Sequence, residues 1–221
     1  MSTTTPETAK DATGESLLSH IDSLREVGRH YWSQGWSLGT SSNYSIRLSR
    51  DPFRLLITAS GKDKSQLSRE DFVQVDSHGK AVSADMPKPS AETMLHVVAA
   101  QLPEVGAVLH THSIWSTILS DVFFDEGAVT IEGYEMLKGL EGIRTHETTF
   151  KLPIFDNTQD IAELSKRVVD RFHEADQPLR YGFLLRKHGL YTWGRDLTEA
   201  KRHVEIIEFL QEAVARRRMF R

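Results

Sequence analysis

Apolar residues recur along the chain with helical spacing in three long segments. Within residues 15–34 a leucine, isoleucine, valine or tyrosine returns every three or four residues, which predicts an amphipathic helix. Residues 160–174 and 196–220 repeat this spacing, and Asp196 with Glu199 is typical of a capping-box start. Shorter helical stretches are expected at 68–71, at 90–101, after Ser113 and around 135–140.

Short runs of aliphatic and β-branched residues predict β-strands between these helices. The strands are expected at 43–48, 54–58, 73–75, 105–109, 129–131, 150–155, 181–186 and 190–193. Pro153 suggests that the sixth run lies at a sheet edge or a strand end. Because strands and helices alternate without a repeat or a long linker, residues 15–221 are expected to form one α/β domain. Residues 1–14, rich in Thr, Ser, Ala and acidic side chains, are expected to form a disordered tail.

Composition narrows the classes of partner. The net charge of −4 is spread along the chain and argues against nucleic acid, which requires a clustered basic surface. No apolar run approaches the roughly 20 residues that span a bilayer, and the N-terminus lacks the apolar centre of a signal peptide. We therefore expect a cytoplasmic protein that binds neither nucleic acid nor membrane. The absence of cysteine excludes disulfides and thiolate metal sites, which leaves histidine and carboxylate as metal ligands.

Two histidines follow the predicted strand 105–109 directly. His110 and His112 are two residues apart, and in an extended chain such residues point to the same face. Both imidazoles can then reach one ion at about 2.0–2.1 Å. Taken alone, this pair is a weak signal, and two surface histidines in a loop are the favoured explanation.

A third histidine strengthens the metal interpretation. His188 lies between two apolar strands and precedes Gly189, which suits a sharp turn with positive φ that would leave His188 exposed at a strand end. Three histidines with an open fourth position are typical of a catalytic zinc site, whereas His188 by itself is a common turn residue. Imidazole also binds iron, manganese and cobalt, so zinc is one of several candidates.

The other histidines require no metal. Most of them are expected on polar helix faces or in turns, namely His20, His30, His78, His173 and His203. His96 follows Glu92 by four residues on a predicted helix, so a local side-chain pair is sufficient to explain it. His146 receives no assignment.

Three segments together resemble the class II aldolase/adducin family. They are His110-Thr111-His112-Ser113, the run 186–194 and Pro89-Ser90-Ala91-Glu92, and the resemblance extends over residues 17–220. The segments 135–139 and 153–157 resemble a branch of dehydratases within that family. The resemblance implies a three-layer α/β/α fold with a central, largely antiparallel or mixed β-sheet. It also implies a homotetramer whose active sites lie near subunit boundaries.

The resemblance also assigns roles to individual residues. His110, His112 and His188 would hold Zn²⁺, and Glu135 would be the acid/base residue of the dehydratase. Glu92 occupies the position of a catalytic glutamate in the aldolases, where some dehydratases have cysteine. Without the resemblance, both glutamates are ordinary helix carboxylates.

Small polar residues at two strand boundaries form a candidate phosphate cradle. The segments 39–43 and 58–62 offer backbone N–H groups, hydroxyls and an amide, but neither is a nucleotide-binding loop. On residues alone they are a pair of ordinary turns. The resemblance implies phosphate contacts from Thr40, Asn43, Ser60, Gly61 and Ser90. Lys62 and Lys138 are candidate additional charges.

The implied activity is a zinc-dependent hydro-lyase of methionine salvage that acts on a phosphorylated methylthio sugar. The first alternative is a class II sugar-phosphate aldolase, which shares the metal but breaks a carbon–carbon bond. The second is a non-catalytic interaction module like the adducin head, against which the complete histidine set argues. A structural metal site in an unrelated domain is a third, disfavoured by the absence of cysteine.

Overall fold

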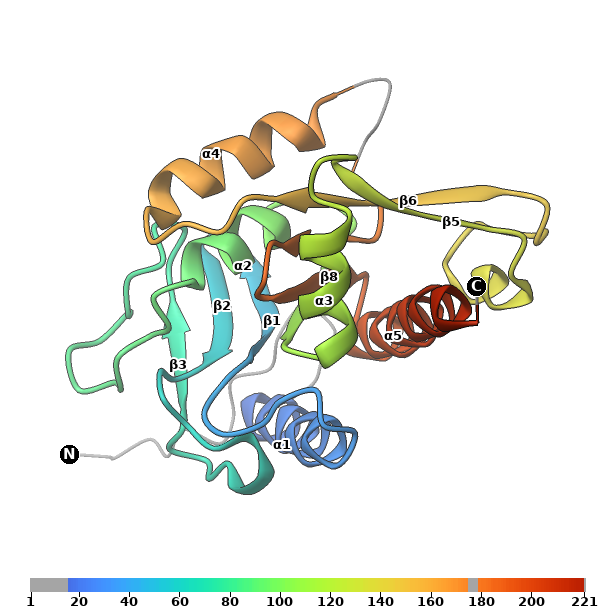
Figure 1. Cartoon of the computed structure of the whole chain (residues 1–221). Helices are drawn as coiled ribbons and strands as arrows, with labels where there is room; N and C mark the ends of the chain where they lie inside the picture. Colours follow the sequence, from blue (N-terminus) through green and yellow to red (C-terminus); the bar gives the residue numbers. More distant parts are fainter. Residues whose placement is uncertain (1–15, 175–178, 221) are drawn as a thin grey trace, which may run out of the picture.

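The computed structural model describes residues 16–174 and 179–220, so the predicted tail at 1–14 lies outside the described residues. Its centre is an eight-stranded sheet with the order β3-β2-β1-β4-β8-β7-β6-β5 (Figure 1). The strands are β1 (Asn43–Arg50), β2 (Phe53–Thr58), β3 (Phe72–Val75), β4 (Ala107–Thr111), β5 (Ala128–Glu132), β6 (Thr149–Phe155), β7 (Gly182–Leu185) and β8 (Gly189–Gly194). Neighbouring strands are antiparallel except β6 and β7, which confirms the expected mixed, largely antiparallel sheet.

Helices cover both faces of this sheet. They are α1 (Leu17–Ser33), α2 (Thr93–Ala100), α3 (Ile114–Val122), α4 (Ile161–Phe172) and α5 (Leu197–Met219), with 3₁₀ turns η2 (Lys64–Gln66) and η3 (Glu135–Gly139). α2 and α4 pack together on one face, whereas α1, α3 and α5 lie on the other (Figure 1). The three-layer α/β/α architecture is therefore confirmed.

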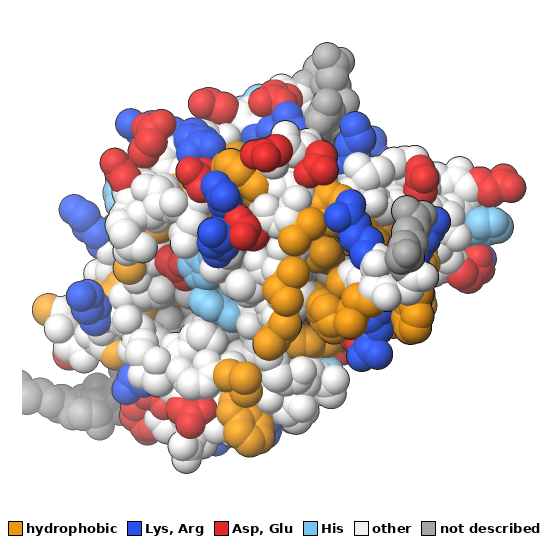
Figure 2. Space-filling view, viewed as in Figure 1, with side chains coloured by type: hydrophobic (Ala, Val, Ile, Leu, Met, Phe, Trp, Pro, Cys, Tyr) orange, Lys and Arg blue, Asp and Glu red, His pale blue; other side chains and the backbone are white. Residues whose placement is uncertain are grey.

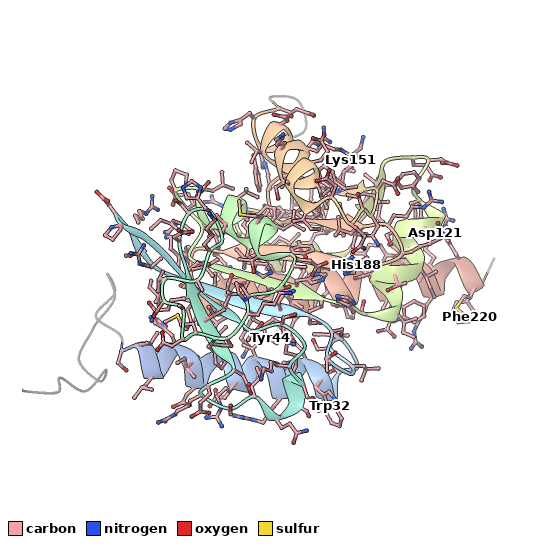
Figure 3. All side chains as sticks on the ribbon, turned by 90° about the vertical axis from the view of Figure 1, so that its left-hand side faces the viewer. Trp32, Tyr44, Asp121, Lys151, His188 and Phe220 are labelled. Atoms are coloured by element: carbon pink, nitrogen blue, oxygen red, sulfur yellow. The ribbon has the colours of Figure 1, made fainter. Side chains whose placement is uncertain are left out.

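Strand alternation builds a core on each face of the sheet. In β4, Val108 joins the core beneath α2 and α4, whereas Ala107 and Leu109 join the core beneath α1 and α5. Successive side chains of a strand point to opposite faces, which explains why these short runs are apolar at every position. Tyr44, buried in this interior, lies centrally in Figure 3, whereas the exposed Trp32 and Phe220 lie at the periphery.

Several element boundaries differ from the sequence prediction. β4 begins two residues later than predicted and continues through His110 and Thr111, so the first histidine belongs to the strand itself. α2 begins at Thr93 and not at residue 90, and its N-cap is Glu92. The carbonyl oxygen of Ser90 accepts a hydrogen bond from the Thr93 hydroxyl in the turn that precedes the helix. Residues 68–71 form a turn closed by the Asp71 carboxylate, not a helix.

Of the two positions predicted for Pro153, a sheet edge or a strand end, the structure shows the second. β6 lies inside the sheet between β5 and β7, so Pro153 is not on an edge strand. It is nevertheless near the strand end, and β7 pairs with β6 only from Ile154 onward.

Sheet register brings distant segments together at one end of the sheet. Asn43 in β1 is the pairing partner of His110 in β4, and His110 also pairs with Tyr191 in β8. The predicted cradle and the predicted metal ligands therefore adjoin one another. Of the helices in the described part of the chain, none is long and apolar enough to span a membrane.

Candidate metal centre and cleft

Three imidazoles converge at this end of the sheet. His110 is the penultimate residue of β4, His112 directly follows the strand, and His188 lies in the turn between β7 and β8. One ligand atom from each lies within 4.8 Å of the others. His112 Nε2 is 2.8 Å from His110 Nε2 and 3.2 Å from His188 Nε2. Two ligands of a tetrahedral zinc ion with Zn–N bonds of about 2.0–2.1 Å lie roughly 3.3 Å apart, so the trio has the required dimensions.

The remaining ring nitrogens hold the imidazoles in place. His110 Nδ1 donates to the Leu190 carbonyl oxygen at 2.9 Å, which leaves Nε2 with a free lone pair. The ring of Tyr191 stacks on His110 with a centroid distance of 3.9 Å. His188 Nδ1 is 3.4 Å from Asn157 Oδ1, and the backbone N–H of His112 donates to the Trp36 carbonyl. Such outer contacts fix ring orientation and raise ligand basicity.

Burial keeps these histidines neutral. Loss of solvation lowers the pKa of His112 to about 3 and that of His110 well below its usual range. Neutral imidazoles that aim lone pairs at one point repel one another unless a cation lies between them. The donor set therefore fits a divalent metal ion.

The turn that carries His188 differs from the prediction. Lys187 has the positive φ, 54°, whereas Gly189 has not. Gly189 is required for another reason: a Cβ there would lie 2.0 Å from the Thr111 carbonyl oxygen, because β8 passes close to β4. His188 is not exposed at a strand end either, since its side chain is only 15% exposed within the cluster.

Glu92 joins the histidines. Its Oε1 lies 3.3 Å from His188 Nε2, and its Oε2 lies 3.6 Å from His110 Nε2. The Asn43 amide donates to Oε2 at 3.1 Å. A carboxylate at this position can balance the charge of a metal ion or exchange a proton with a bound molecule.

A polar cleft of about 270 Å³ opens beside the histidines. All five predicted cradle residues line it: Thr40, Asn43, Ser60, Gly61 and Ser90. Gly61 has a φ of 69°, a conformation that favours glycine and turns the backbone between strand β2 and η2. Figure 2 shows histidine side chains in a hollow at the centre of one face, with a band of apolar side chains beside it. The cleft offers hydroxyl and amide donors next to the metal position.

The two predicted lysines lie outside this cleft. Lys62 forms an ion pair with Asp71 at 2.8 Å, and Lys138 forms one with Glu135. Neither lysine is among the described residues that line the cleft.

Glu135 is also separate from the three metal-site histidines of its own chain. It lies on η3, which packs against α5, and its side chain is 68% exposed. Its carboxylate contacts Lys138 and lies 3.3 Å from His146 Nδ1. The hydrogen bond from Lys138 is the main reason why the pKa of Glu135 is lowered. A single chain therefore does not unite Glu135 with the metal site.

Some histidine predictions need correction. His96 does not pair with Glu92; it is fully buried and bonds to Ser45 and Asn43 instead. His20 and His203 are buried, not on polar faces, and His203 contacts the Trp193 carbonyl at 2.7 Å. No local spacing signals these partners.

Sequence reasoning also missed residues around the site. Asn157 lies in a segment that carried the resemblance, yet it received no role, and it both contacts His188 and lines the cleft. Tyr191 and Glu208 support the metal-bearing strands from behind. Tyr191 lies in the run 186–194 that resembles the family, which is the one signal for it. Nothing in the sequence distinguishes Glu208 from the other helix glutamates.

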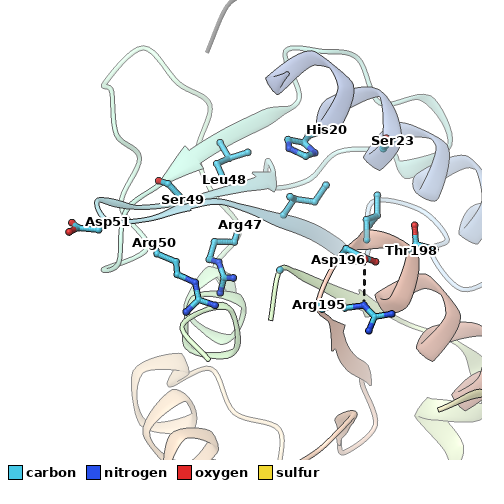
Figure 4. Close-up of a pocket in the computed structure, with 13 residues that line it drawn as sticks. His20, Ser23, Arg47, Leu48, Ser49, Arg50, Asp51, Arg195, Asp196 and Thr198 are labelled. Carbon is cyan, nitrogen blue, oxygen red and sulfur yellow. Dashed lines mark ion pairs between the residues drawn. The ribbon is translucent and has the colours of Figure 1, made fainter. Parts of the chain in front are cut away.

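A larger cavity, about 690 Å³, lies at the opposite end of the sheet (Figure 4). Three arginines line it, but two of them are engaged. Arg47 donates to the carbonyls of Ala100 and Leu102, and Arg195 contacts Asp196. The cavity contains none of the residues of the metal centre, so size alone does not identify the functional site.

Comparisons with known proteins agree with this geometry. The family described as Class II Aldolase and Adducin N-terminal domain matches residues 22–214. Methylthioribulose-1-phosphate dehydratase from Marinobacter nauticus is 49% identical over 191 residues, 86% of this chain and 89% of that protein. The protein of the same name from Stenotrophomonas maltophilia is 46% identical over 198 residues, 89% of this chain and 88% of the other.

A solved structure shows the same fold. L-fuculose-1-phosphate aldolase from Thermus thermophilus superposes with a TM-score of 0.70 at 21% identity, over 91% of this chain and 97% of the other. At that identity the likeness concerns the fold alone. With a family match that spans most of the described residues, this chain belongs to the class II aldolase and adducin family.

Proposed function

We propose that this chain is a zinc-dependent methylthioribulose-1-phosphate dehydratase. It would remove water from 5-methylthioribulose 1-phosphate to give 2,3-diketo-5-methylthiopentyl 1-phosphate, a step of methionine salvage in the cytoplasm. The observation that carries the proposal is the convergence of three imidazoles beside a polar cleft. Relatives that are 46–49% identical over most of the chain bear the name of this activity.

His110, His112 and His188 would hold the zinc ion. Three neutral imidazoles with an open coordination position are typical of catalytic zinc. The bound ion supplies Lewis acidity, which polarises a carbonyl and stabilises the negative charge that develops when a neighbouring C–H bond is broken.

The reaction requires one proton to be taken and one to be given. The C3 hydrogen leaves as a proton, and the C4 hydroxyl departs as water after it receives a proton. The resulting enol tautomerises to the diketone. We assign the acid/base role in these proton transfers to Glu135. Such a role typically contributes a factor of about 10²–10⁴ in rate. Glu92, next to the histidines, would orient the substrate hydroxyls and contribute charge at the metal.

The cradle would bind the phosphate of the substrate. Hydroxyls come from Thr40, Ser60 and Ser90, amide N–H groups from Asn43, and a backbone N–H group from Gly61. Neutral donors of this kind fix the position of an anion without a salt bridge. The phosphate then determines which carbons of the sugar lie beside Glu92.

A homotetramer would complete the site. Glu135 lies outside the cleft of its own chain, so it must approach the cleft of a neighbouring subunit to act there. The exposed side chains of Ile114, Ile118 and Val122 form an apolar stripe on α3. This helix also contacts the metal-bearing turn, because the Thr117 hydroxyl donates to the His188 carbonyl. A subunit that covers the stripe would therefore sit beside the metal.

One assay tests the proposal. Purified protein is incubated with 5-methylthioribulose 1-phosphate, and the diketone is detected with and without a chelator. We expect product only without the chelator, and loss of both metal and activity in His110→Ala. Cleavage of fuculose 1-phosphate or ribulose 5-phosphate, without diketone formation, would favour an aldolase. A protein that retains no divalent ion after purification without chelator would favour a non-catalytic module.

A further inference from the structure

Behind the cleft, a row of buried polar side chains connects the proposed phosphate cradle with the interior of the protein. Ser45 and Asn43 are two residues apart on β1 and point to the same face, toward His96 on α2. His96 is fully buried between them. Its Nδ1 lies 2.8 Å from Ser45 Oγ, and its Nε2 contacts Asn43 Oδ1.

The far end of this row reaches the cleft. The Asn43 amide nitrogen lies 3.1 Å from Glu92 Oε2 and 3.2 Å from Ser90 Oγ. The row thus connects the interior with both the metal-site carboxylate and the predicted phosphate cradle. The edge of the His96 ring also meets Tyr191, the residue that stacks on His110.

The chemistry of these groups determines where the hydrogens lie. An ionised carboxylate only accepts hydrogen bonds, so the NH₂ end of Asn43 must face Glu92. The amide oxygen then faces His96, and Nε2 must carry a hydrogen to donate to it. In the neutral ring Nδ1 is then the acceptor for the Ser45 hydroxyl at 2.8 Å, a shorter contact than the 3.3 Å from that hydroxyl to the Val108 carbonyl oxygen. Burial lowers the pKa of His96 to about 3, which keeps the ring neutral.

The opposite tautomer would place two hydrogen-bond acceptors against each other. With the hydrogen on Nδ1, the Nε2 lone pair would face the Asn43 oxygen. Rotation of the amide to avoid this contact would place its oxygen against the Glu92 carboxylate. In a buried setting each of these contacts leaves polar atoms without a hydrogen-bond partner, which is unfavourable.

We propose that His96 is a positioning residue that, as the Nε2–H tautomer, locks the Asn43 amide with its N–H groups toward the cleft. Asn43 in turn holds Glu92 against the histidines and donates its second amide hydrogen to the Ser90 hydroxyl of the phosphate cradle. The effect on turnover rests on the proposed function, whereas the tautomer and the amide orientation do not.

The first test needs no substrate. Nitrogen-15 NMR of the full-length, zinc-loaded protein with labelled histidine distinguishes the two neutral tautomers, and loss of one signal in His96→Gln assigns it. We expect a proton on Nε2 and none on Nδ1 between pH 6 and 8. A hydrogen on Nδ1 would overturn the proposal, whatever reaction the protein catalyses.

The second test compares variants that keep or remove the donor. The amide nitrogen of glutamine can take the place of Nε2–H, whereas leucine has no donor. We expect His96→Leu to lose about 10- to 100-fold in kcat/KM and to raise the inhibition constant of inorganic phosphate, with zinc content unchanged. His96→Gln should be at least about tenfold more active than His96→Leu. His78→Leu, at an exposed turn residue, is the control.

The outcomes separate the possible failures. Equal activity of His96→Leu and the unaltered protein contradicts the positioning role. Equal impairment of His96→Gln and His96→Leu, with normal zinc content, contradicts the donor assignment. If the protein does not turn over the methylthio sugar phosphate, the proposed function fails, but the NMR result and the phosphate inhibition of any alternative aldolase activity still test His96.

Discussion

Glu208 shows how a single residue can support a metal site without contacting the metal. It lies on α5 with only 2% of its surface exposed. Its Oε1 accepts hydrogen bonds from the hydroxyls of Thr111 at 3.0 Å and Ser116 at 3.3 Å. Thr111 ends β4 and separates His110 from His112, and Ser116 belongs to the first turn of α3. Glu208 therefore connects β4 with α3, the two elements that precede and follow His112.

This burial makes the stability of the protein depend on pH. Loss of solvation raises the pKa of Glu208 from 4.5 to about 7. Between these values the unfolded chain releases the proton before the folded chain does, so the free energy of unfolding falls as pH rises. Between pH 5 and 8 we expect it to fall by about 2–3 kcal/mol relative to Glu208→Gln, which cannot ionise.

Chemical denaturation of metal-free protein at several pH values checks this prediction. Glu26→Gln, an exposed carboxylate on α1, serves as the control and should follow the unaltered protein. Parallel stability curves for the unaltered protein and Glu208→Gln would show that Glu208 is already ionised at pH 5.

At the scale of elements, the pairing of β4 with β8 brings the histidines together. The two strands approach closely at both ends of β4. A Cβ on Gly189 would lie 2.0 Å from the Thr111 carbonyl oxygen, and one on Gly106 would lie 2.1 Å from the Arg195 carbonyl oxygen. The first contact is beside His110 and the second is at the opposite end of the sheet, so the same steric change can be made near the metal and far from it.

Gly189→Ala and Gly106→Ala should therefore differ in one property only. Each should lower the free energy of unfolding by about 1–3 kcal/mol, because each forces backbone apart. Only Gly189→Ala should weaken zinc binding, by about 10- to 100-fold, since it displaces the strand end that carries His110. Competition with a chromophoric chelator measures the affinity. Equal zinc affinity in the two variants would mean that the cluster tolerates movement of β8.

At the scale of the whole molecule, the catalytic assignment of Glu135 requires more than one chain. Its carboxylate is exposed on η3 and contacts Lys138 and His146. The metal-site residues His112 and His188 line a separate cleft. If the proposed homotetramer forms, each site would combine the histidines of one subunit with Glu135 of the next.

Mixing of inactive subunits tests this arrangement. His110→Ala and Glu135→Gln should each be inactive alone, Glu135→Gln with its zinc retained. Coexpressed in equal amounts as a cyclic tetramer, they should recover about a quarter of the normal activity, the fraction of interfaces that join two intact halves. Replacement of His110→Ala by the double variant His110→Ala/Glu135→Gln should abolish this recovery. Activity no greater than that of the separate variants would assign Glu135 to its own chain or to no catalytic role.

Local patterns were sufficient to predict most of the architecture. Among the described residues, apolar periodicity identified α1, α4 and α5, cap residues indicated α2 and α3, and short apolar runs identified the eight strands. Periodicity works because burial of one face imposes spacing on neighbours in sequence. The spacing of His110 and His112 is also a local pattern, because alternation along an extended chain places both rings on the same side. The mixed sheet needed the family resemblance as well, whereas His188 was assigned to the metal site together with the other two histidines.

The tertiary structure alone decided which distant residues meet. The register of β1 against β4 places Asn43 beside His110, and the packing of α2 on the sheet places His96 behind Asn43. A helix spacing of four suggested a partner for His96 that the folded chain does not use. Likewise, Gly189 suggested a turn, whereas the close passage of two strands explains it. Contacts between distant segments depend on sheet order and on packing across layers, and neither leaves a periodic signal in the chain.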